Sequence, residues 1–236
     1  MRVEIWTDIS CPWCYVGQAR FEKALAAFPH RADVEVVHRS FQLDPRRTKG
    51  DAEPIIGVLM RGKGWTREQA QANEDTLSRQ SAALGLKYVM GRDHGYTFDM
   101  HRLLHFAKEQ GRQHELLTLL YRANFAEERS VYDDDERLVD LAAEAGLDAD
   151  AARKVLADPS AHAEDVHADL REAAAVGATG VPFFVLDRRF AVSGAQRPEV
   201  FTQALTEAWE SRPSLPVVAG AVHGDACGPD GCPVPH

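Results

Sequence analysis

The four cysteines of the chain form two close pairs, one near each end. Two residues separate Cys11 from Cys14, four separate Cys227 from Cys232, and no cysteine lies between the pairs. A disulfide-stabilised scaffold spreads many cysteines over a small core, so that class of protein is excluded. Close pairs instead indicate thiol–disulfide exchange or metal binding, in which the thiolate is the reactive form.

The residues around the first pair predict that it opens a helix. Val3–Thr7 is β-branched and aromatic, which predicts a strand, and Val34–Phe41 predicts a second one. Between them, Pro12 suits the first turn of a helix, where its missing N–H costs nothing. The free N–H groups and partial positive charge at a helix start stabilise a thiolate, so Cys11 is the expected nucleophile and Cys14 the resolving thiol. Half of a zinc site, or two unrelated buried thiols, remain as alternatives.

The predicted secondary structure changes twice along the rest of the chain. From Asp44 to about Gly177 it is expected to be almost wholly helical, with apolar stripes at helical spacing. Strand character returns at Gly180–Leu186, a hairpin turn is expected at Asp187–Arg189, and Pro198–Trp209 predicts a last amphipathic helix. The Pro- and Gly-rich tail that follows has too little apolar content to form a core element, so we expect it to lie on the surface or to be partly mobile.

Net charge and hydropathy limit the classes of partner that the chain is expected to bind. The chain carries 27 Lys and Arg against 36 Asp and Glu, a net charge of −9, which argues against a nucleic-acid partner. No apolar run approaches the ~18–20 residues of a membrane helix, so no membrane partner is expected. No leader-like apolar segment follows Met1, and we therefore expect a cytoplasmic protein. In that reducing compartment, cysteine pairs are catalytic, redox-sensing or metal-binding.

Four stretches carry a resemblance to a known family. The first two are Asp8-Ile9-Ser10-Cys11-Pro12-Trp13-Cys14-Tyr15 and Gly180-Val181-Pro182-Phe183-Phe184, and residues 97–102 and 191–196 add to them. Together they resemble the DsbA-type thioredoxin-fold oxidoreductases, and more closely the cytoplasmic FrnE-like branch. That branch is related to 2-hydroxychromene-2-carboxylate isomerases and kappa-class glutathione transferases. The resemblance implies an α/β chain with a thioredoxin fold over residues 1–45 and 178–212, a helical insertion over residues 46–177 and an extended tail over residues 213–236.

The resemblance also implies roles for individual residues. Cys11 would be the exposed nucleophile and Cys14 the buried resolving thiol, while Val181-Pro182 matches the loop with a cis proline opposite the pair. Trp13, Val181, Pro182 and Phe183 are the expected substrate-binding residues, with Val181 free to pair with an extended substrate segment. Trp13 stands where periplasmic DsbA has a histidine, so we expect a weaker oxidant, better suited to isomerisation or reduction. No cofactor is expected.

These observations predict a protein disulfide oxidoreductase or isomerase that acts on protein substrates bearing thiols or disulfides, together with a thioredoxin- or glutathione-type reductant. One alternative is a glutathione-dependent isomerase or transferase of a small aromatic molecule, although relatives with that activity carry Ser at the position of Cys11. Another is a redox or metal sensor that uses the tail cysteines.

The tail pair has three interpretations. Cys227 and Cys232 could exchange electrons with the first pair, or form a local staple across the Pro229-Asp230-Gly231 turn. They could also bind zinc in a set comprising His223, Cys227, Cys232 and His236.

Overall fold

A four-stranded sheet lies at the centre of the computed structural model, which describes residues 1–212. Its strand order is β2-β1-β5-β6. The parallel pair is β1 (Arg2–Thr7) and β2 (Glu35–Ser40), in register from Arg2 opposite Glu35. Antiparallel to β1 runs β5 (Phe183–Leu186), which pairs in turn with β6 (Phe190–Ser193). The predicted strands and the α/β class are therefore confirmed.

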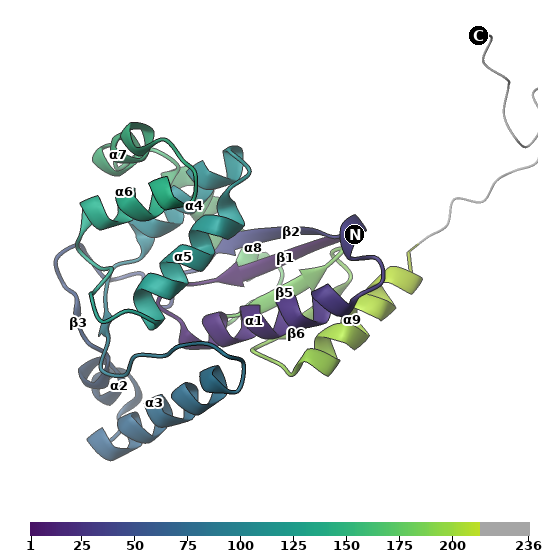
Figure 1. Cartoon of the computed structure of the whole chain (residues 1–236), viewed down its shortest axis with the longest axis horizontal. Coiled ribbons are helices and arrows are strands. Elements are labelled where there is room, and N and C mark those ends of the chain that lie inside the picture. The colour runs from purple at the N-terminus through teal and green to yellow at the C-terminus, as the bar shows by residue number, and fades with distance from the viewer. Residues whose placement is uncertain (213–236) are drawn as a thin grey trace, which may run out of the picture.

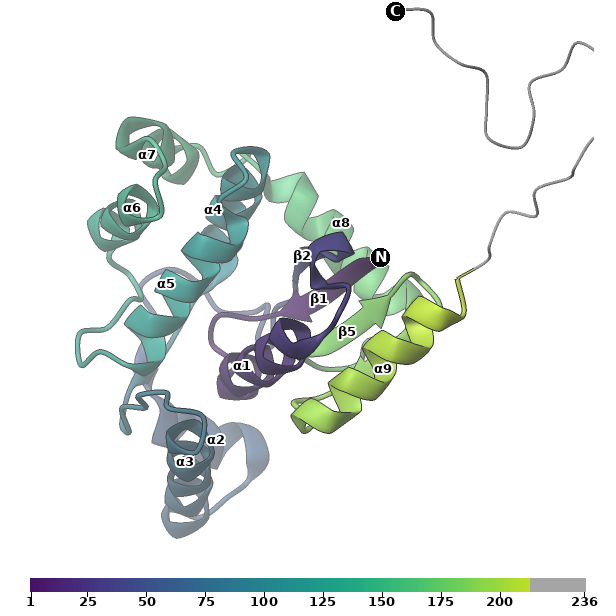
Figure 2. The same cartoon turned by 45° about the vertical axis from the view of Figure 1, so that its right-hand side comes forward.

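Helices cover both faces of this sheet (Figures 1 and 2). The crossover from β1 to β2 is α1 (Pro12–Ala27), preceding the short 3-10 turn Arg31–Asp33, and α9 (Pro198–Glu210) packs beside α1. The core on this side is built from aromatic rings, with the Phe184 and Phe201 centroids 4.6 Å apart. On the other side, α8 (Ala163–Ala175) contacts β2, and Trp6 donates a 3.0 Å hydrogen bond from its indole to the Asp169 carbonyl.

The segment between β2 and β5 is mainly helical, as expected. Besides α8 it contains α2 (Ile55–Lys63), α3 (Arg67–Ala82), α4 (Phe98–Glu109), α5 (Gln113–Phe125), α6 (Asp135–Glu144) and α7 (Ala149–Ala157). The two-residue strands β3 (Glu53–Pro54) and β4 (Asp93–His94) pair with each other, which the helical pattern does not predict. The buried core formed by α4 to α7 also contains Ile9, Cys11 and Cys14, so the first cysteine pair packs against these helices.

The predicted hairpin turn is confirmed, and an acidic run explains where one helix starts. The hairpin between β5 and β6 turns through Asp187 and Arg188, both with positive φ (48° and 57°). The acidic run before α6 starts that helix, since the Asp134 carboxylate caps it by accepting a hydrogen bond from the Arg137 N–H. No helix among the described residues has the length and apolar character needed to cross a membrane.

Candidate active site

Cys11 is the N-cap residue of α1. Its φ and ψ of −85° and 110° are extended, and its carbonyl accepts the first helical hydrogen bonds, from the N–H groups of Cys14 (3.0 Å) and Tyr15 (3.3 Å). Pro12 occupies the first turn, as its fixed φ and missing N–H favour. No acidic side chain lies in that turn, so the positive end of the helix dipole acts on the Cys11 sulfur without an opposing carboxylate from α1.

The loop before β5 closes over Cys11. The Val181–Pro182 peptide bond is cis, as the resemblance implies. The Cys11 thiol donates a 3.6 Å hydrogen bond to the Val181 carbonyl. Gly17, one turn beyond Cys14, allows this loop to approach α1, because a Cβ at residue 17 would lie 2.8 Å from Cγ of Pro182.

Cys14 lies deeper than Cys11 in the interior. It is 1% exposed, and both cysteines are free thiols in this structure. Burial raises the pKa of the Cys14 thiol well above its usual value, and the neighbouring Cys11 thiol raises that pKa further. The Thr7 hydroxyl, itself hydrogen-bonded to the Tyr121 hydroxyl, acts in the opposite direction. Cys14 is therefore a protonated thiol until its proton is withdrawn.

Two of the expected site features need correction. Cys11 is only 4% exposed, not an exposed thiol, because Ile9 and the α4–α7 core pack around it. Phe183 does not line the site, since the alternation of β5 directs it to the opposite layer, where it packs with Trp6 and Ala173. Of the other expected substrate-binding residues, Trp13 is 36% exposed at the surface and Val181 and Pro182 form the loop opposite Cys11.

Cys11 nevertheless reaches solvent through a cavity of about 590 Å³, which we call the thiol cavity. Cys11, Trp13 and Val181 line one part of it, and another part is lined by Ile55, Val58 and Leu59 of α2, Trp65 between α2 and α3, and Glu74 of α3. A nucleophile at the wall of such a cavity is accessible to a substrate segment.

Buried polar side chains that the sequence patterns do not reveal form part of this cavity. Glu74, Arg92 and His94 line it and are 1%, 7% and 7% exposed. Glu74 Oε1, Arg92 Nε and His94 Nδ1 have no hydrogen-bond partner among the described residues. Burial lowers the pKa of His94, which favours its neutral form. Arg92 is nonetheless held in place, because its guanidinium lies 4.9 Å from the Phe125 ring centroid.

Asp8 is an ionised group immediately before the first cysteine pair. Its carboxylate accepts hydrogen bonds from the N–H groups of Leu43 (2.8 Å) and Ser10 (3.3 Å) and lies 3.5 Å from Nε2 of His101. Burial opposes ionisation, but the imidazole and the two N–H groups outweigh it and lower the pKa of Asp8. Asp8 therefore anchors the segment 40–44 to the turn that leads into Cys11.

No group of three or more His, Cys, Asp or Glu side chains within residues 1–212 is arranged to hold a metal ion. The tail pair and the alternative zinc set, His223, Cys227, Cys232 and His236, lie outside the described residues.

Comparison with known proteins identifies the architecture. The family model described as a DsbA-like thioredoxin domain matches residues 2–206. The crystal structure of a probable DsbA oxidoreductase from Streptomyces coelicolor is similar to this chain, with 64% identity, a TM-score of 0.89 and both chains covered completely. The predicted thioredoxin fold and the suspected family are confirmed.

More distant structures share the fold alone. The cytosolic disulfide reductase DsbM of Pseudomonas aeruginosa is 16% identical with a TM-score of 0.62, over 89% of this chain and 99% of its own. A 2-hydroxychromene-2-carboxylate isomerase is also 16% identical, with a TM-score of 0.66, over 89% of this chain and 97% of its own.

Proposed function

Because the chain belongs to the family of DsbA-like thioredoxin domains, whose members include oxidoreductases, we propose that it catalyses thiol–disulfide exchange and disulfide isomerisation in proteins through Cys11 and Cys14. One observation carries this proposal: Cys11 is the N-cap residue of α1, and its thiol faces the Val181–Pro182 loop and lines the thiol cavity. The fold by itself does not decide between chemistries, whereas this placement activates a sulfur and gives it access to a substrate.

The exchange proceeds in two balanced steps. Cys11, as a thiolate, attacks one sulfur of a substrate disulfide, so that a Cys11–substrate disulfide forms and the other substrate sulfur leaves as a thiolate. In net reduction, Cys14 passes its proton to the substrate thiolate released in the first step and attacks the Cys11 sulfur, which forms the Cys11–Cys14 disulfide and releases the second substrate sulfur as a thiolate. In isomerisation, a thiol of the substrate attacks instead, and Cys11 returns to its starting state.

The burial of Cys14 favours the second outcome. Its raised pKa keeps Cys14 protonated, and a protonated thiol does not attack a disulfide. The mixed disulfide at Cys11 therefore persists long enough for a substrate thiol to compete. This property supports an isomerase rather than a rapid oxidant.

The proposed partners follow from the cavity and the fold. An extended substrate segment would pass Trp13 at the rim and pair with the backbone of the loop at Val181, while apolar residues of α2 receive its side chains. A thioredoxin- or glutathione-type reductant would reduce the Cys11–Cys14 disulfide. Cys227 and Cys232 are proposed to mediate that transfer, and the cytoplasm is the proposed compartment.

Insulin reduction and the refolding of scrambled ribonuclease test this proposal. We expect Cys11→Ser to abolish both activities, and Cys14→Ser to accumulate a Cys11–substrate disulfide that is visible on a non-reducing gel. The Cys227→Ser/Cys232→Ser variant should keep the insulin activity with dithiothreitol and lose part of it with a protein reductant. Turnover by Cys11→Ser equal to that of the unmodified protein would refute the mechanism.

Trp13 provides a quantitative test of the redox poise. An imidazolium at residue 13 would stabilise the Cys11 thiolate, which lowers the free energy of the reduced form and makes the disulfide more oxidising. We expect Trp13→His to shift the equilibrium with glutathione toward the reduced protein by at least tenfold, about 1.4 kcal/mol. Trp13→Phe, which preserves an aromatic ring without a charge, is the control. An equal shift in both variants would contradict the electrostatic explanation.

A second candidate activity is favoured by the polar wall of the thiol cavity. The unpartnered atoms of Glu74, Arg92 and His94 suit a small ligand with both charged and polar groups, as glutathione has. A glutathione-dependent isomerisation or transfer on a small aromatic molecule would then occur here. Activity of this kind that survives Cys11→Ser, in a protein inactive on insulin, would favour this alternative.

A further inference from the structure

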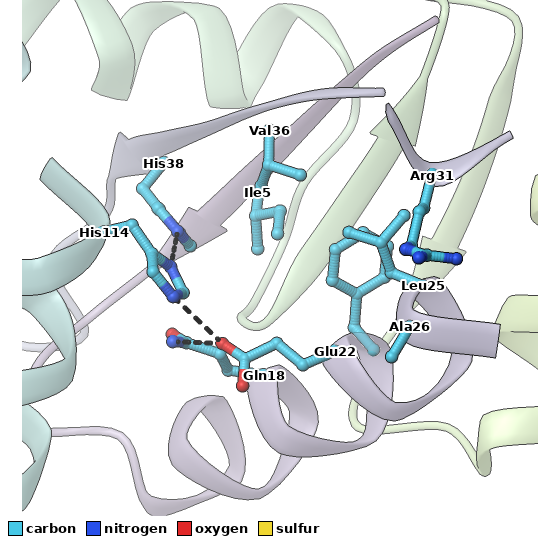
Figure 3. Close-up of a pocket in the computed structure, with 10 residues that line it drawn as sticks. Ile5, Gln18, Glu22, Leu25, Ala26, Arg31, Val36, His38 and His114 are labelled. Carbon is cyan, nitrogen blue, oxygen red and sulfur yellow. Dashed lines mark hydrogen bonds and ion pairs between the residues drawn. The ribbon is translucent and has the colours of Figure 1, made fainter. Parts of the chain in front are cut away.

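A second hollow lies between α1 and the strands β1 and β2, and we call it the α1–β2 groove (Figure 3). Its volume is about 370 Å³. The apolar side chains that line it come from β1, β2 and α1, namely Ile5, Phe21, Leu25, Ala26 and Val36. Leu25 and Val36 are half-buried and Ala26 is exposed, so this apolar surface is open to solvent rather than enclosed.

Polar residues mark the two ends of the groove. Arg31 lies at one end, and Gln18, Glu22, His38 and His114 gather at the other (Figure 3). There the His38 and His114 rings stack with centroids 5.7 Å apart, and Glu22 accepts a 2.8 Å hydrogen bond from the Gln18 amide. The two ends give the groove a direction, along α1 from its last residues toward the cysteines.

The edge strand β2 leaves one pair of backbone groups available beside the groove. The outward-facing N–H and C=O of His38 are bonded to the Gln113 amide at 3.1 and 3.0 Å, and the Ser40 N–H donates to Asp169 at 2.8 Å. By the alternation of a strand, Val36 also directs its N–H and C=O outward, and they have no partner in residues 1–212. A bound segment could therefore make main-chain hydrogen bonds at Val36.

The last described residues end close to the Arg31 end of the groove. Trp209 in α9 stacks on His30, with ring centroids 4.0 Å apart and planes at 7°, and Arg212 lies 3.2 Å from the Trp209 ring centroid. His30 immediately precedes Arg31. The chain therefore leaves α9 beside the entrance of the groove.

The sequence that follows α9 is apolar, like the lining of the groove. Leu215–Val222 contains no charged residue and includes Leu215, Val217, Val218 and Val222. We propose that residues 215–222 of this same chain bind in the α1–β2 groove. Tethering favours this occupant over a second copy or another protein, because a short linker gives a local concentration in the millimolar range.

Binding in this direction bears on the chemistry, a consequence that rests on the proposed function. Gln18 at the far end of the groove lies one helical turn from Cys14, roughly 6 Å along the α1 axis. Cys227 follows Val222 by about five residues, which span up to roughly 17 Å when extended. The groove would thus hold the tail so that its cysteine pair is within reach of the first pair.

Photo-crosslinking of the full chain tests the binding itself, without any activity assay. A benzophenone amino acid replaces Val218, the protein is irradiated, and the crosslinked peptides are identified by mass spectrometry. We expect crosslinks within one chain to residues 18–38. We also expect Ala26→Arg, which places a charge on the apolar lining, to reduce their yield at least about fivefold.

Ala27→Arg is the matched control, because Ala27 is the exposed neighbour of Ala26 in α1 and does not line the groove. It should leave the crosslinks unchanged. Crosslinks between two chains would assign the groove to a second copy and overturn the proposal. Crosslinks spread over the surface, or equal yields in the two arginine variants, would also overturn it. Because neither variant alters a cysteine, loss of the crosslink and failure of the disulfide chemistry are distinguishable.

Discussion

Two regions of buried charge in the molecule differ in how fully their charges are paired. Between α8 and the sheet, the Asp169 carboxylate lies 2.9 Å from Arg39 Nη1 and 3.1 Å from His105 Nε2, and accepts a 2.8 Å hydrogen bond from the Ser40 N–H. In the same region, the Glu4 carboxylate pairs with Arg39 and Arg188. Within residues 1–212, none of these carboxylate oxygens lacks a partner.

The wall of the thiol cavity is the second region, and its charges are incompletely paired. Glu74 accepts a 2.9 Å hydrogen bond from the Tyr88 hydroxyl, but its other oxygen lies 3.8 Å from the Arg92 guanidinium and accepts none. Burying a polar group without a hydrogen bond costs free energy, so such groups need a reason. The charges under α8 are paired and maintain the fold, whereas the unpaired atoms of the cavity wall support our proposal that a ligand binds there.

The largest effect should come from breaking the paired region. Asp169→Ala leaves Arg39 and His105 buried without their carboxylate, and we expect the free energy of unfolding to fall by about 3–5 kcal/mol in urea titrations. Asp165→Ala, one turn earlier in α8 and exposed, should change it by less than about 0.5 kcal/mol. Equal losses in the two variants would mean that the Asp169 contacts contribute no more to the unfolding free energy than an exposed carboxylate does.

The contacts of Asp169 also predict that the folded protein loses stability at acid pH. Burial alone would raise the pKa of Asp169, but His105, the Ser40 N–H and Arg39 together lower that pKa. A carboxyl with a lowered folded-state pKa stabilises the protein above its unfolded pKa of 3.8, and that contribution is lost as the pH falls through the folded-state pKa.

His38 represents a third way to bury an ionisable group, which is to keep it neutral. It is 4% exposed, and burial, with a smaller contribution from His114, lowers its pKa from 6.5 to about 3. Below pH 6.5 the unfolded chain binds a proton at this position that the folded chain does not, so stability falls as the pH decreases toward 3.

Between pH 7 and pH 5, we expect wild type to lose about 2 kcal/mol more unfolding free energy than His38→Gln. Urea titrations at the two pH values measure this difference. His167→Gln, which alters an exposed histidine, should lose as much as wild type over the same interval. A His38→Gln variant with the full acid sensitivity of wild type would show that His38 is not the neutral group responsible.

The contrast between the two regions also explains what the sequence could predict. The strands and α1 follow from local patterns, because Pro12 and the β-branched run at Val3–Thr7 act over a few residues. The position of Cys11 as a helix N-cap is equally local. The burial of Cys11 is not, since it depends on α4 to α7, which begin only at Phe98, beyond the reach of any spacing pattern.

The sequence could not predict the polar residues of the cavity wall for the same reason. Arg92 and His94 lie in a segment with no helical or strand period, and nothing in their neighbours indicates that they meet Glu74 of α3. The prediction for Phe183 is wrong in the opposite way, because its position next to Pro182 suggests a substrate-binding side chain at the surface. The alternation of β5 places its side chain in the core instead.

The smallest effect on stability, and the sharpest test of the comparison, should come from Glu74→Gln. Glutamine retains an acceptor for the Tyr88 hydroxyl and the shape of the side chain, so we expect the unfolding free energy to change by about 1 kcal/mol or less. Because the charge faces the cavity, the KM for oxidised glutathione in a Cys11-dependent reduction assay should rise roughly tenfold with little change in kcat.

Glu128→Gln removes the same charge from an exposed position and serves as the control. It should change neither the KM nor the stability. If Glu74→Gln instead destabilised the protein as strongly as Asp169→Ala, with an unchanged KM, the charge at Glu74 would be structural like that at Asp169. The charges of both regions would then stabilise the fold, and the proposal that the cavity wall binds a ligand would be contradicted.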